Sequence, residues 1–383
     1  MANSLRELAR HGQSVWYDSL RRGILVSGEL ARYIEDDGLT GLTTNPSIYE
    51  KAIAGSSDYD AELATLVPRQ DLDAKAIYEQ LAFRDIQAAA DLLRPVYERT
   101  ARRDGYVSLE VSPSVARDAH ASLAEARRLW RALGRENVMI KVPGTPEALP
   151  AIRELLAEGV NVNVTLLFSR EAYARVAEAH LAALVDRASR GEDLSRLASV
   201  ASFFVSRVDA LVDGLLEEVC ASSQVAAVQE RAEALRGRVA IANAKLAYQD
   251  WRALVASPRW ARLSALGARP QRLLWASTST KNASYRDVMY VEQLIGPETV
   301  DTMPPATFDA FRDHGRVRST LEADVEGARA AMAELAALGI SIADVTDRLL
   351  ADGLRLFTEP FGKLLAAIEA RRAVAAGTGA PGP

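Results

Sequence analysis

The sequence contains a single cysteine, Cys220, among its 383 residues, so it can form no internal disulfide bond. This absence fits a protein of a reducing compartment, and we expect a cytoplasmic location. The four histidines, His11, His120, His180 and His314, are scattered without the spacing of metal ligands, so we expect no metal site. The chain also lacks the glycine-rich loops that bind phosphates or dinucleotides.

Long apolar runs and an excess of either charge are missing too. No run of about 18 apolar residues occurs, so we expect no membrane span. Residues 1–13 are polar and charged, unlike the apolar core of a signal peptide. The formal net charge is -5, with acidic and basic residues interspersed, which gives no sign of a nucleic-acid or membrane partner.

The sequence does contain a regular alternation of short strand-like runs with longer amphipathic stretches. Eight runs read as strands: Ser14–Asp18, Gly41–Asn45, Val107–Val111, Val138–Val142, Val160–Leu166, Ser199–Val205, Arg272–Ala276 and Thr299–Met303. Helical patterns between them include Lys75–Arg102, Pro113–Leu133, Glu147–Glu158 and Arg170–Arg190. This order predicts parallel strands joined by right-handed crossovers, and eight such units predict a closed (β/α)8 barrel.

Two regions contain more helical pattern than the repeated strand–helix unit needs. Residues 209–270 form a long connection with an extra helical pattern at Arg238–Val255. The C-terminal part reads as two helices, Leu321–Leu338 and Ile342–Arg372, and we expect Pro360 to interrupt the second. We favour additions that cover barrel helices or the mouth of the active site. The alternative is that they serve contacts between chains, since the protein is expected to be a monomer or a homodimer.

The final residues, 375–383, are rich in glycine and proline, which indicates a disordered tail. The expected fold is therefore α/β: a single (β/α)8 barrel domain over residues 1–374, with helical additions in 209–270 and at the C-terminus.

Lys141 lies in the apolar, strand-like stretch Asn137–Pro143, where burying a charged amine is costly. Strand alternation puts it on one face with Met139 and Pro143. Desolvation disfavours the ammonium form of a lysine, and a neutral amine is a nucleophile toward carbonyl carbon. The functional hypothesis is a lysine that forms a Schiff base. The alternative is a lysine near a strand end whose amine reaches water.

Polar residues recur where the other predicted strands end. They are Asp18 on the first strand, Thr43 and Asn45 on the second, Glu110 on the third, Asn163 and Thr165 on the fifth, Ser202 and Arg207 on or after the sixth, and Ser277 and Lys281 after the seventh. Taken singly, Asp18 or Asn45 could cap a helix, and Arg207 or Lys281 could be a surface charge. Taken together, they would share the carboxyl-end rim of one barrel, where active sites form.

Five segments in order resemble the transaldolase family, in its longer bacterial form. The resemblance runs from about residue 14 to residue 315. It is carried by Gly41–Ser47 (GLTTNPS), Ile140–Pro143 (IKVP), Asn163–Ser169 (NVTLLFS), Ala276–Asn282 (ASTSTKN) and Val300–Pro304 (VDTMP). The family implies a (β/α)8 barrel and a cofactor-free exchange of a dihydroxyacetone unit between sugar phosphates, in the non-oxidative pentose phosphate pathway.

The resemblance also implies roles for individual residues. Lys141 matches the Schiff-base lysine and Asp18 the acid/base, while Glu110 and Thr165 match the pair that positions a catalytic water. Asn45 and Asn163 match residues that hold the hydroxyl groups of the three-carbon unit, and Thr43 and Ser202 lie close to them. Arg207 matches an arginine that binds the phosphate.

The sequence departs from the family pattern after the seventh predicted strand. Many shorter members have an arginine two residues after the serine that matches Ser277, whereas Lys281 supplies the cation here. A lysine binds phosphate as a point charge rather than as a planar fork.

Two other functions remain as alternatives. One is a fructose-6-phosphate aldolase on the same scaffold, which releases free dihydroxyacetone. Those relatives typically carry Gln at the position of Glu110 and Tyr at that of Phe204, so both residues favour the transferase. The other is a non-catalytic barrel used for binding. The presence of Lys141, Asp18 and Glu110 speaks against it.

Overall fold

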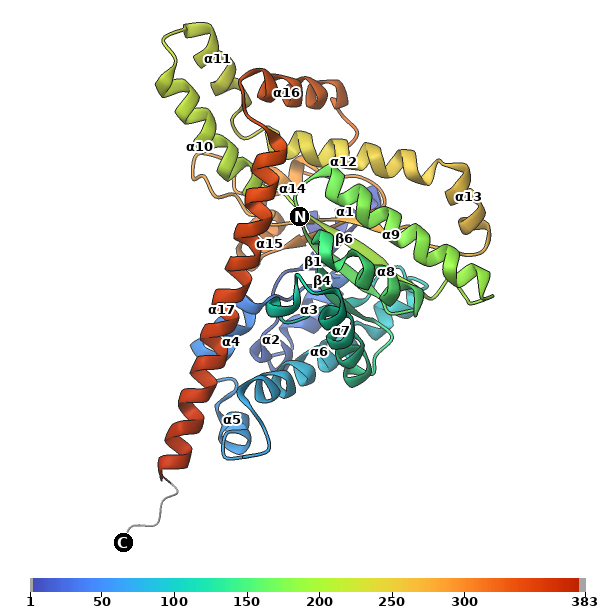
Figure 1. Ribbon diagram of the computed structural model, residues 1–383, viewed down its shortest axis with the longest axis vertical. Coiled ribbons are helices and arrows are strands. Elements are labelled where there is room, and N and C mark those ends of the chain that lie inside the picture. Colours follow the sequence, from blue (N-terminus) through green and yellow to red (C-terminus); the bar gives the residue numbers. More distant parts are fainter. Residues whose placement is uncertain (1–2, 379–383) are drawn as a thin grey trace.

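The computed structural model describes residues 3–378, which form a closed barrel of eight parallel strands surrounded by helices (Figure 1). Each strand pairs with its neighbours in sequence, and β8 closes the ring against β1. The strands are β1 (Gln13–Tyr17), β2 (Gly41–Leu42), β3 (Tyr106–Glu110), β4 (Val138–Pro143), β5 (Val162–Leu167), β6 (Ser199–Phe204), β7 (Arg272–Ala276) and β8 (Thr299–Met303). The predicted (β/α)8 barrel is confirmed.

The strand β2 is shorter than the predicted Gly41–Asn45. Its first residue packs so closely on Trp16 that an added Cβ would lie 2.4 Å from the indole ring. The segment then turns into a helix, because Asn45 caps the helix N-terminus and Pro46 takes its first turn. A helix that begins here leaves room for only two strand residues.

Helices follow every strand. Those before β1 and after β1 to β5 are α1 (Ser4–Leu8), α2 (Arg22–Val26), α3 (Glu29–Asp36), α4 (Pro46–Gly55), α5 (Asp60–Leu66), α6 (Ala74–Arg99), α7 (Ala119–Leu133), α8 (Leu149–Ala157) and α9 (Arg170–Ser189), with short 3-10 helices at Ala9–His11, Pro113–Val115 and Pro146–Ala148. Those after β6 to β8 are α10 (Ser206–Ser222), α11 (Ala226–Leu235), α12 (Val239–Val255), α13 (Pro258–Ala265), α14 (Met289–Gln293), α15 (Pro305–His314), α16 (Val325–Ala337) and α17 (Ile342–Thr378).

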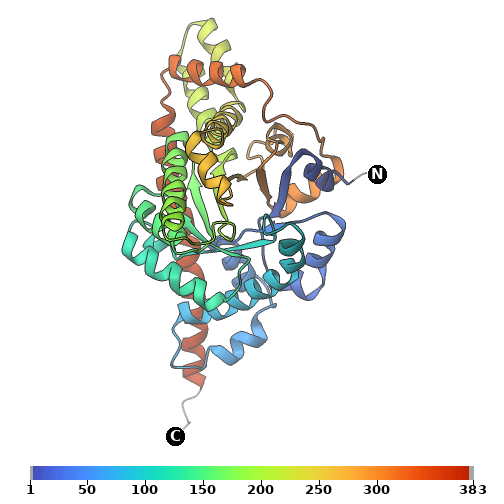
Figure 2. The ribbon, with the colours of Figure 1, turned by 90° about the vertical axis from the view of Figure 1, so that its right-hand side faces the viewer.

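The additions expected in residues 209–270 are present as α10 to α13. In both views α10, α11 and α16 project from one end of the barrel (Figures 1 and 2). The helix α12 packs between this projection and the barrel, because it contacts α16 on one side and α9 on another. The helix α12 therefore covers the barrel helix α9, as we favoured from the sequence, while the role of the projecting helices stays a prediction.

The prediction that Pro360 interrupts the last helix is wrong, since α17 runs through it from Ile342 to Thr378. A proline inside a helix costs about 3 kcal/mol. Packing offsets this cost, because α17 contacts α4, α6 and α10 and buries an apolar seam that includes Phe357, Phe361 and Leu364. The helix also includes residues 375–378, where we expected the disordered tail to begin, and residues 379–383 lie outside the described residues.

Candidate active site

Lys141 sits in the middle of three paired strands. The register places it beside Glu110 of β3 and beside Asn163 of β5. The residue is only 5% exposed, and its Nζ donates a hydrogen bond to the carbonyl oxygen of Thr44 at 3.2 Å. Its amine therefore does not reach bulk water, and the alternative of a solvent-seeking lysine is wrong.

Glu110 is the carboxylate nearest to this amine. Its Oε2 lies 3.5 Å from Lys141 Nζ, and both side chains are buried. Burial raises the pKa of Glu110 to about 7, since desolvation outweighs the attraction of Lys141, and the charge of Asp18 adds to the rise. A carboxyl group with this pKa can give or take a proton near neutral pH.

A second carboxylate, Asp18, follows β1 on the other side of the lysine. Its Oδ1 accepts a hydrogen bond of 2.6 Å from the hydroxyl of Thr43. Burial of the carboxyl group raises the pKa of Asp18, although the residue keeps some exposure, and the charge of Lys141 together with the Thr43 hydroxyl opposes this rise. Asp18 therefore accepts a hydrogen bond from the residue that follows β2 and does not cap the next helix, whose N-cap is Arg21.

A chain of hydrogen bonds crosses the barrel interior next to Lys141. Ser202 Oγ donates to Asn163 Oδ1 at 2.7 Å, and Asn163 Nδ2 donates to Ser108 Oγ at 3.1 Å. These bonds fix the orientation of the Asn163 amide. Thr165 lies two residues further along β5, and its buried hydroxyl has no hydrogen-bond partner within the described chain. Glu110 Oε2 shares this property.

A cavity of about 140 Å³ opens at the carboxyl ends of the strands. It is lined by nine of the predicted site residues: Asp18, Thr43, Asn45, Lys141, Ser202, Phe204, Arg207, Ser277 and Lys281. The other three predicted site residues do not line the cavity. Glu110 is ion-paired with Lys141, Asn163 accepts a hydrogen bond from Ser202, and Thr165 lies near the carboxyl end of β5. The structure thus brings the predicted residues to one end of the barrel.

Two cations occupy one side of the cavity. Arg207 begins α10, and Lys281 follows β7. Partial desolvation lowers the pKa of both groups, although Lys281 keeps an exposed surface, and the positive charge of Arg207 lowers the pKa of Lys281 further. Lys281 Nζ donates to Ser279 Oγ at 2.7 Å. Two facing cations in one cavity form a site that an anion would stabilise.

Asn45 caps a helix, as one interpretation of the sequence allowed, and it also lies at the cavity. Its Oδ1 accepts a hydrogen bond from the backbone N–H of Ile48 and so caps α4, while the residue also lines the cavity.

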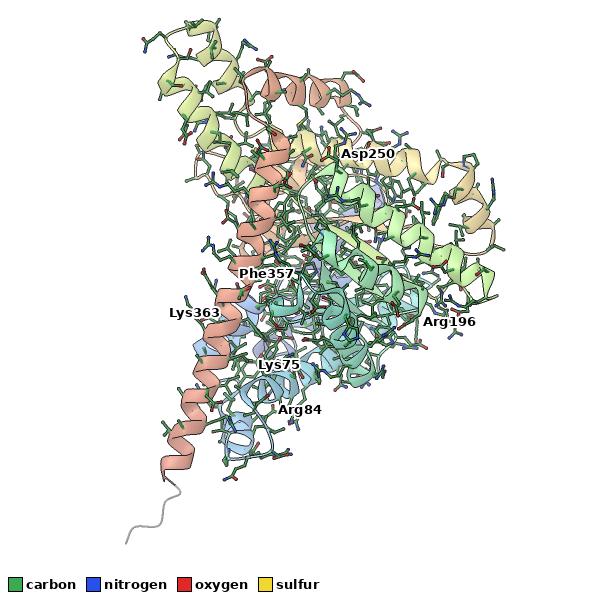
Figure 3. The ribbon with its side chains drawn as sticks, viewed as in Figure 1. Lys75, Arg84, Arg196, Asp250, Phe357 and Lys363 are labelled. Atoms are coloured by element: carbon green, nitrogen blue, oxygen red, sulfur yellow. The ribbon has the colours of Figure 1, made fainter. Side chains whose placement is uncertain are left out.

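The structure adds contacts that the sequence did not predict. Thr302 of β8 is 2.7 Å from the Thr43 hydroxyl, and Phe357 of α17 lines the cavity with its ring centre 5.7 Å from Lys141 Nζ. Figure 3 shows Phe357 on the stretch of α17 that lies alongside the barrel. No local pattern in the sequence indicated this contact.

Two residues beside the cavity have left-handed backbones. Leu166 has φ of 59° and Ser277 has φ of 57°. Such a conformation costs on the order of 1–3 kcal/mol in a residue with a side chain. At Leu166 it coincides with a register shift between β5 and β6, directly after Thr165. These conformations change the direction of the backbone at the carboxyl ends of β5 and β7, and with it the direction of the side chains there.

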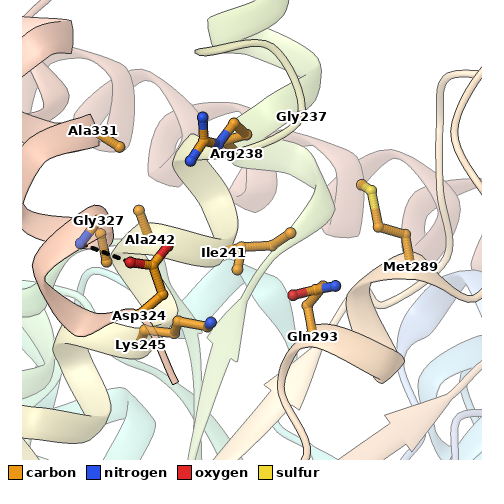
Figure 4. Close-up of a pocket in the computed structure, with 11 residues that line it drawn as sticks. Gly237, Arg238, Ile241, Ala242, Lys245, Met289, Gln293, Asp324, Gly327 and Ala331 are labelled. Carbon is orange, nitrogen blue, oxygen red and sulfur yellow. Dashed lines mark hydrogen bonds between the residues drawn. The ribbon is translucent and has the colours of Figure 1, made fainter. Parts of the chain in front are cut away.

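A larger pocket, of about 280 Å³, lies away from the barrel mouth, between α12, α14 and α16 (Figure 4). It contains none of the predicted site residues. Among residues 3–378, no group of histidine, cysteine or carboxylate side chains could hold a metal ion. None of the helices in the described part of the chain is long and apolar enough to cross a membrane.

A closed (β/α)8 barrel with a buried lysine, two carboxylates and two cations at its carboxyl end defines a barrel enzyme. A model of the family described as transaldolase/fructose-6-phosphate aldolase matches residues 15–368. The chain belongs to this family.

Named relatives match almost the whole chain. A protein named transaldolase from Trichodesmium erythraeum is 48% identical over 371 residues, which cover 96% of this chain and 97% of the relative. A protein named transaldolase 2 from Nostoc punctiforme is 49% identical with the same coverage. One named transaldolase from Neisseria gonorrhoeae is 43% identical over 94% of this chain and 98% of its own length.

Proposed function

We propose that this chain is a transaldolase that transfers a dihydroxyacetone unit through a Schiff base on Lys141. The reaction converts sedoheptulose 7-phosphate and glyceraldehyde 3-phosphate into erythrose 4-phosphate and fructose 6-phosphate, a step of the non-oxidative pentose phosphate pathway. The observation that carries the proposal is the buried Lys141 amine, 3.5 Å from Glu110, in one cavity with Asp18 and two cations.

The reaction begins when the amine of Lys141 attacks the ketone carbon of the donor sugar phosphate. A carbinolamine forms and loses water, which requires a proton donor. Glu110, with its pKa of about 7, supplies this proton through a water held between its Oε2 and the Thr165 hydroxyl. Neither buried oxygen has a hydrogen-bond partner within the described residues, although Glu110 Oε2 is ion-paired with Lys141, so each can still bond to that water.

The iminium on Lys141 then withdraws electrons from the neighbouring carbon. Asp18, as a carboxylate, removes the proton of the C4 hydroxyl group, and the C3–C4 bond breaks. The aldose phosphate leaves, and the enamine of dihydroxyacetone stays on Lys141. Asn45, Asn163 and Ser202 hold its hydroxyl groups until the second aldose phosphate enters, the enamine carbon bonds to its aldehyde carbon, and Asp18 returns the proton to the new hydroxyl group. Water then adds to the resulting iminium, the C–N bond breaks, and the new ketose phosphate leaves with the amine of Lys141 restored.

The phosphate of either sugar binds between Arg207 and Lys281, whose charges meet at the cavity. Ser277 and Ser279 line the same side and add hydroxyl donors. Lys281 thereby takes the place of the arginine of shorter family members. It supplies the same positive charge, but its ammonium group cannot bind the phosphate through two parallel hydrogen bonds as a guanidinium does.

Transfer, rather than release of free dihydroxyacetone, is supported by Phe204. This residue is buried, packs on Phe168 with ring centres 5.1 Å apart and lines the cavity. It offers no hydroxyl group that could direct a water to the enamine, unlike the tyrosine of the aldolase relatives. The site therefore favours an aldehyde acceptor.

A coupled assay tests this function. With fructose 6-phosphate and erythrose 4-phosphate together, glyceraldehyde 3-phosphate and sedoheptulose 7-phosphate should form in equal amounts. With fructose 6-phosphate alone, turnover should be far slower. Equal rates of free dihydroxyacetone formation with and without the acceptor would instead identify an aldolase.

A further inference from the structure

The C-terminal helix α17 contributes one side chain, Phe357, to the active-site cavity. The ring is buried at 6% exposure, and its centre lies 5.7 Å from Lys141 Nζ. This contact joins two residues more than 200 positions apart in the sequence. The face of an aromatic ring attracts a cation and excludes water from the space that it fills.

Several contacts hold α17 so that Phe357 stays in place. Phe361, one turn further along, packs edge-to-face on Tyr78 of α6 with ring centres 5.5 Å apart. Near the far end of the helix, Arg371 forms an ion pair of 2.9 Å with Asp60 of α5. Both contacts fix the helix on the C-terminal side of the point where the ring lies.

The approach of α17 to the barrel is also close one turn before Phe357. Gly353 lies against the end of β5, where an added Cβ would lie 3.0 Å from a methyl carbon of Leu166. On the same turn the charge of Asp352 acts on Arg207, the phosphate-side cation. Two consecutive turns of α17 therefore lie close to the barrel: one carries Phe357 into the cavity, and the other brings the charge of Asp352 near Arg207.

We propose that Phe357 determines the fate of the enamine: it closes the cavity over Lys141 against bulk solvent, so that the bound three-carbon unit passes to an aldehyde before solvent water releases it. This inference rests on the proposed transaldolase function. It assigns to a residue of the C-terminal helix the selectivity between group transfer and hydrolytic release.

The competing release step shows what the ring must prevent. The enamine takes up a proton at carbon and becomes the iminium of dihydroxyacetone. Water then adds to the iminium carbon and gives a carbinolamine. The C–N bond breaks, the lysine amine is restored, and dihydroxyacetone leaves with a proton returned to solvent. In transfer the same enamine carbon bonds to the aldehyde carbon of the acceptor, so both the proton donor and the water must be kept away.

The test is the ratio of two rates measured on one preparation. The first is free dihydroxyacetone formation from fructose 6-phosphate alone, and the second is transfer turnover with erythrose 4-phosphate added. Phe357→Ala should raise this ratio about tenfold, the effect of removing roughly 1.4 kcal/mol of selectivity. Phe357→Leu, which keeps apolar bulk but no ring, should give an intermediate ratio, and it serves as the second variant if the alanine form folds poorly.

Leu364→Ala is the matched control. Leu364 is fully buried on the same helix but does not line the cavity. This variant loosens the packing of α17 without opening the space over Lys141, so its ratio should equal that of the unaltered enzyme. A ratio that rises equally in Leu364→Ala, or that stays unchanged in both Phe357 variants, overturns the assignment.

The outcome is separable from that of the proposed function. If the unaltered enzyme transfers the three-carbon unit and is trapped by borohydride with fructose 6-phosphate, the transaldolase function stands whatever the Phe357 variants show. If the unaltered enzyme does neither, the proposed function fails, and this inference fails with it.

Discussion

The hydroxyl of Thr43 donates a hydrogen bond of 2.6 Å to the carboxylate of Asp18, and this bond joins the residue that follows β2 to the residue that follows β1. The same hydroxyl lies 2.7 Å from that of Thr302. Because Thr43 gives its proton to Asp18, the proton between the two threonines comes from Thr302. The bond favours the ionised form of Asp18, against the effect of burial.

Replacing Thr43 with valine keeps the volume of the side chain and removes this bond. The pKa of Asp18 should then rise further, and the acid limb of the pH–rate profile should move upward by about one unit, the equivalent of one hydrogen bond to a charged group. Thr302→Val is the control, since it leaves the bond to Asp18 in place. A profile that moves equally in both variants, or in neither, would show that Thr43 does not tune Asp18.

The role of Lys281 can be separated from that of the chemistry. Lys281→Ala should raise KM for fructose 6-phosphate about 10- to 100-fold, since one charge-assisted contact to the phosphate is lost. Borohydride trapping of dihydroxyacetone itself, which carries no phosphate, should stay unchanged. Lys281→Arg should restore most of the affinity, because it keeps the charge. If the alanine variant binds fructose 6-phosphate normally, the phosphate lies elsewhere.

Glu110 gives a prediction for stability as well as for rate. Its pKa is 4.5 in its ordinary state and about 7 in the folded chain. Between these values the folded protein keeps a proton that the unfolded chain has lost, so ionising Glu110 destabilises the fold as pH rises. Glu110→Gln removes this penalty.

Urea unfolding of both forms measures the effect. The stability of Glu110→Gln relative to the unaltered enzyme should increase by on the order of 3 kcal/mol from about pH 5 to about pH 8. The variant should also lose most of its turnover, because an amide cannot pass a proton to the water. A relative stability that does not change with pH would mean that Glu110 is ionised throughout.

Much of the barrel follows from the sequence because its signals are local. The run Val138–Val142 reads as a strand on its own composition, and the alternation of such runs with helical patterns fixes the parallel order. The polar residues at the strand ends then meet at one rim. Their shared location needs only the barrel geometry, not the details of packing.

The features that the sequence did not predict depend on contacts between distant segments. The continuity of α17 through Pro360 results from packing against α4 and α6, which no local pattern contains. The position of Phe357 over Lys141 has the same origin. The left-handed backbone at Leu166 could not be inferred either, since leucine has no preference for that conformation, and the surrounding structure imposes it.

The most direct test is to incubate the enzyme with fructose 6-phosphate, reduce it with borohydride and locate the added mass by peptide mapping. A dihydroxyacetone unit fixed as a secondary amine on Lys141, and absent from the Lys141→Ala variant, is the expected result. A Lys141→Ala variant that is still modified or still turns over substrate would contradict the mechanism, because Lys141 would then not be the amine that forms the Schiff base.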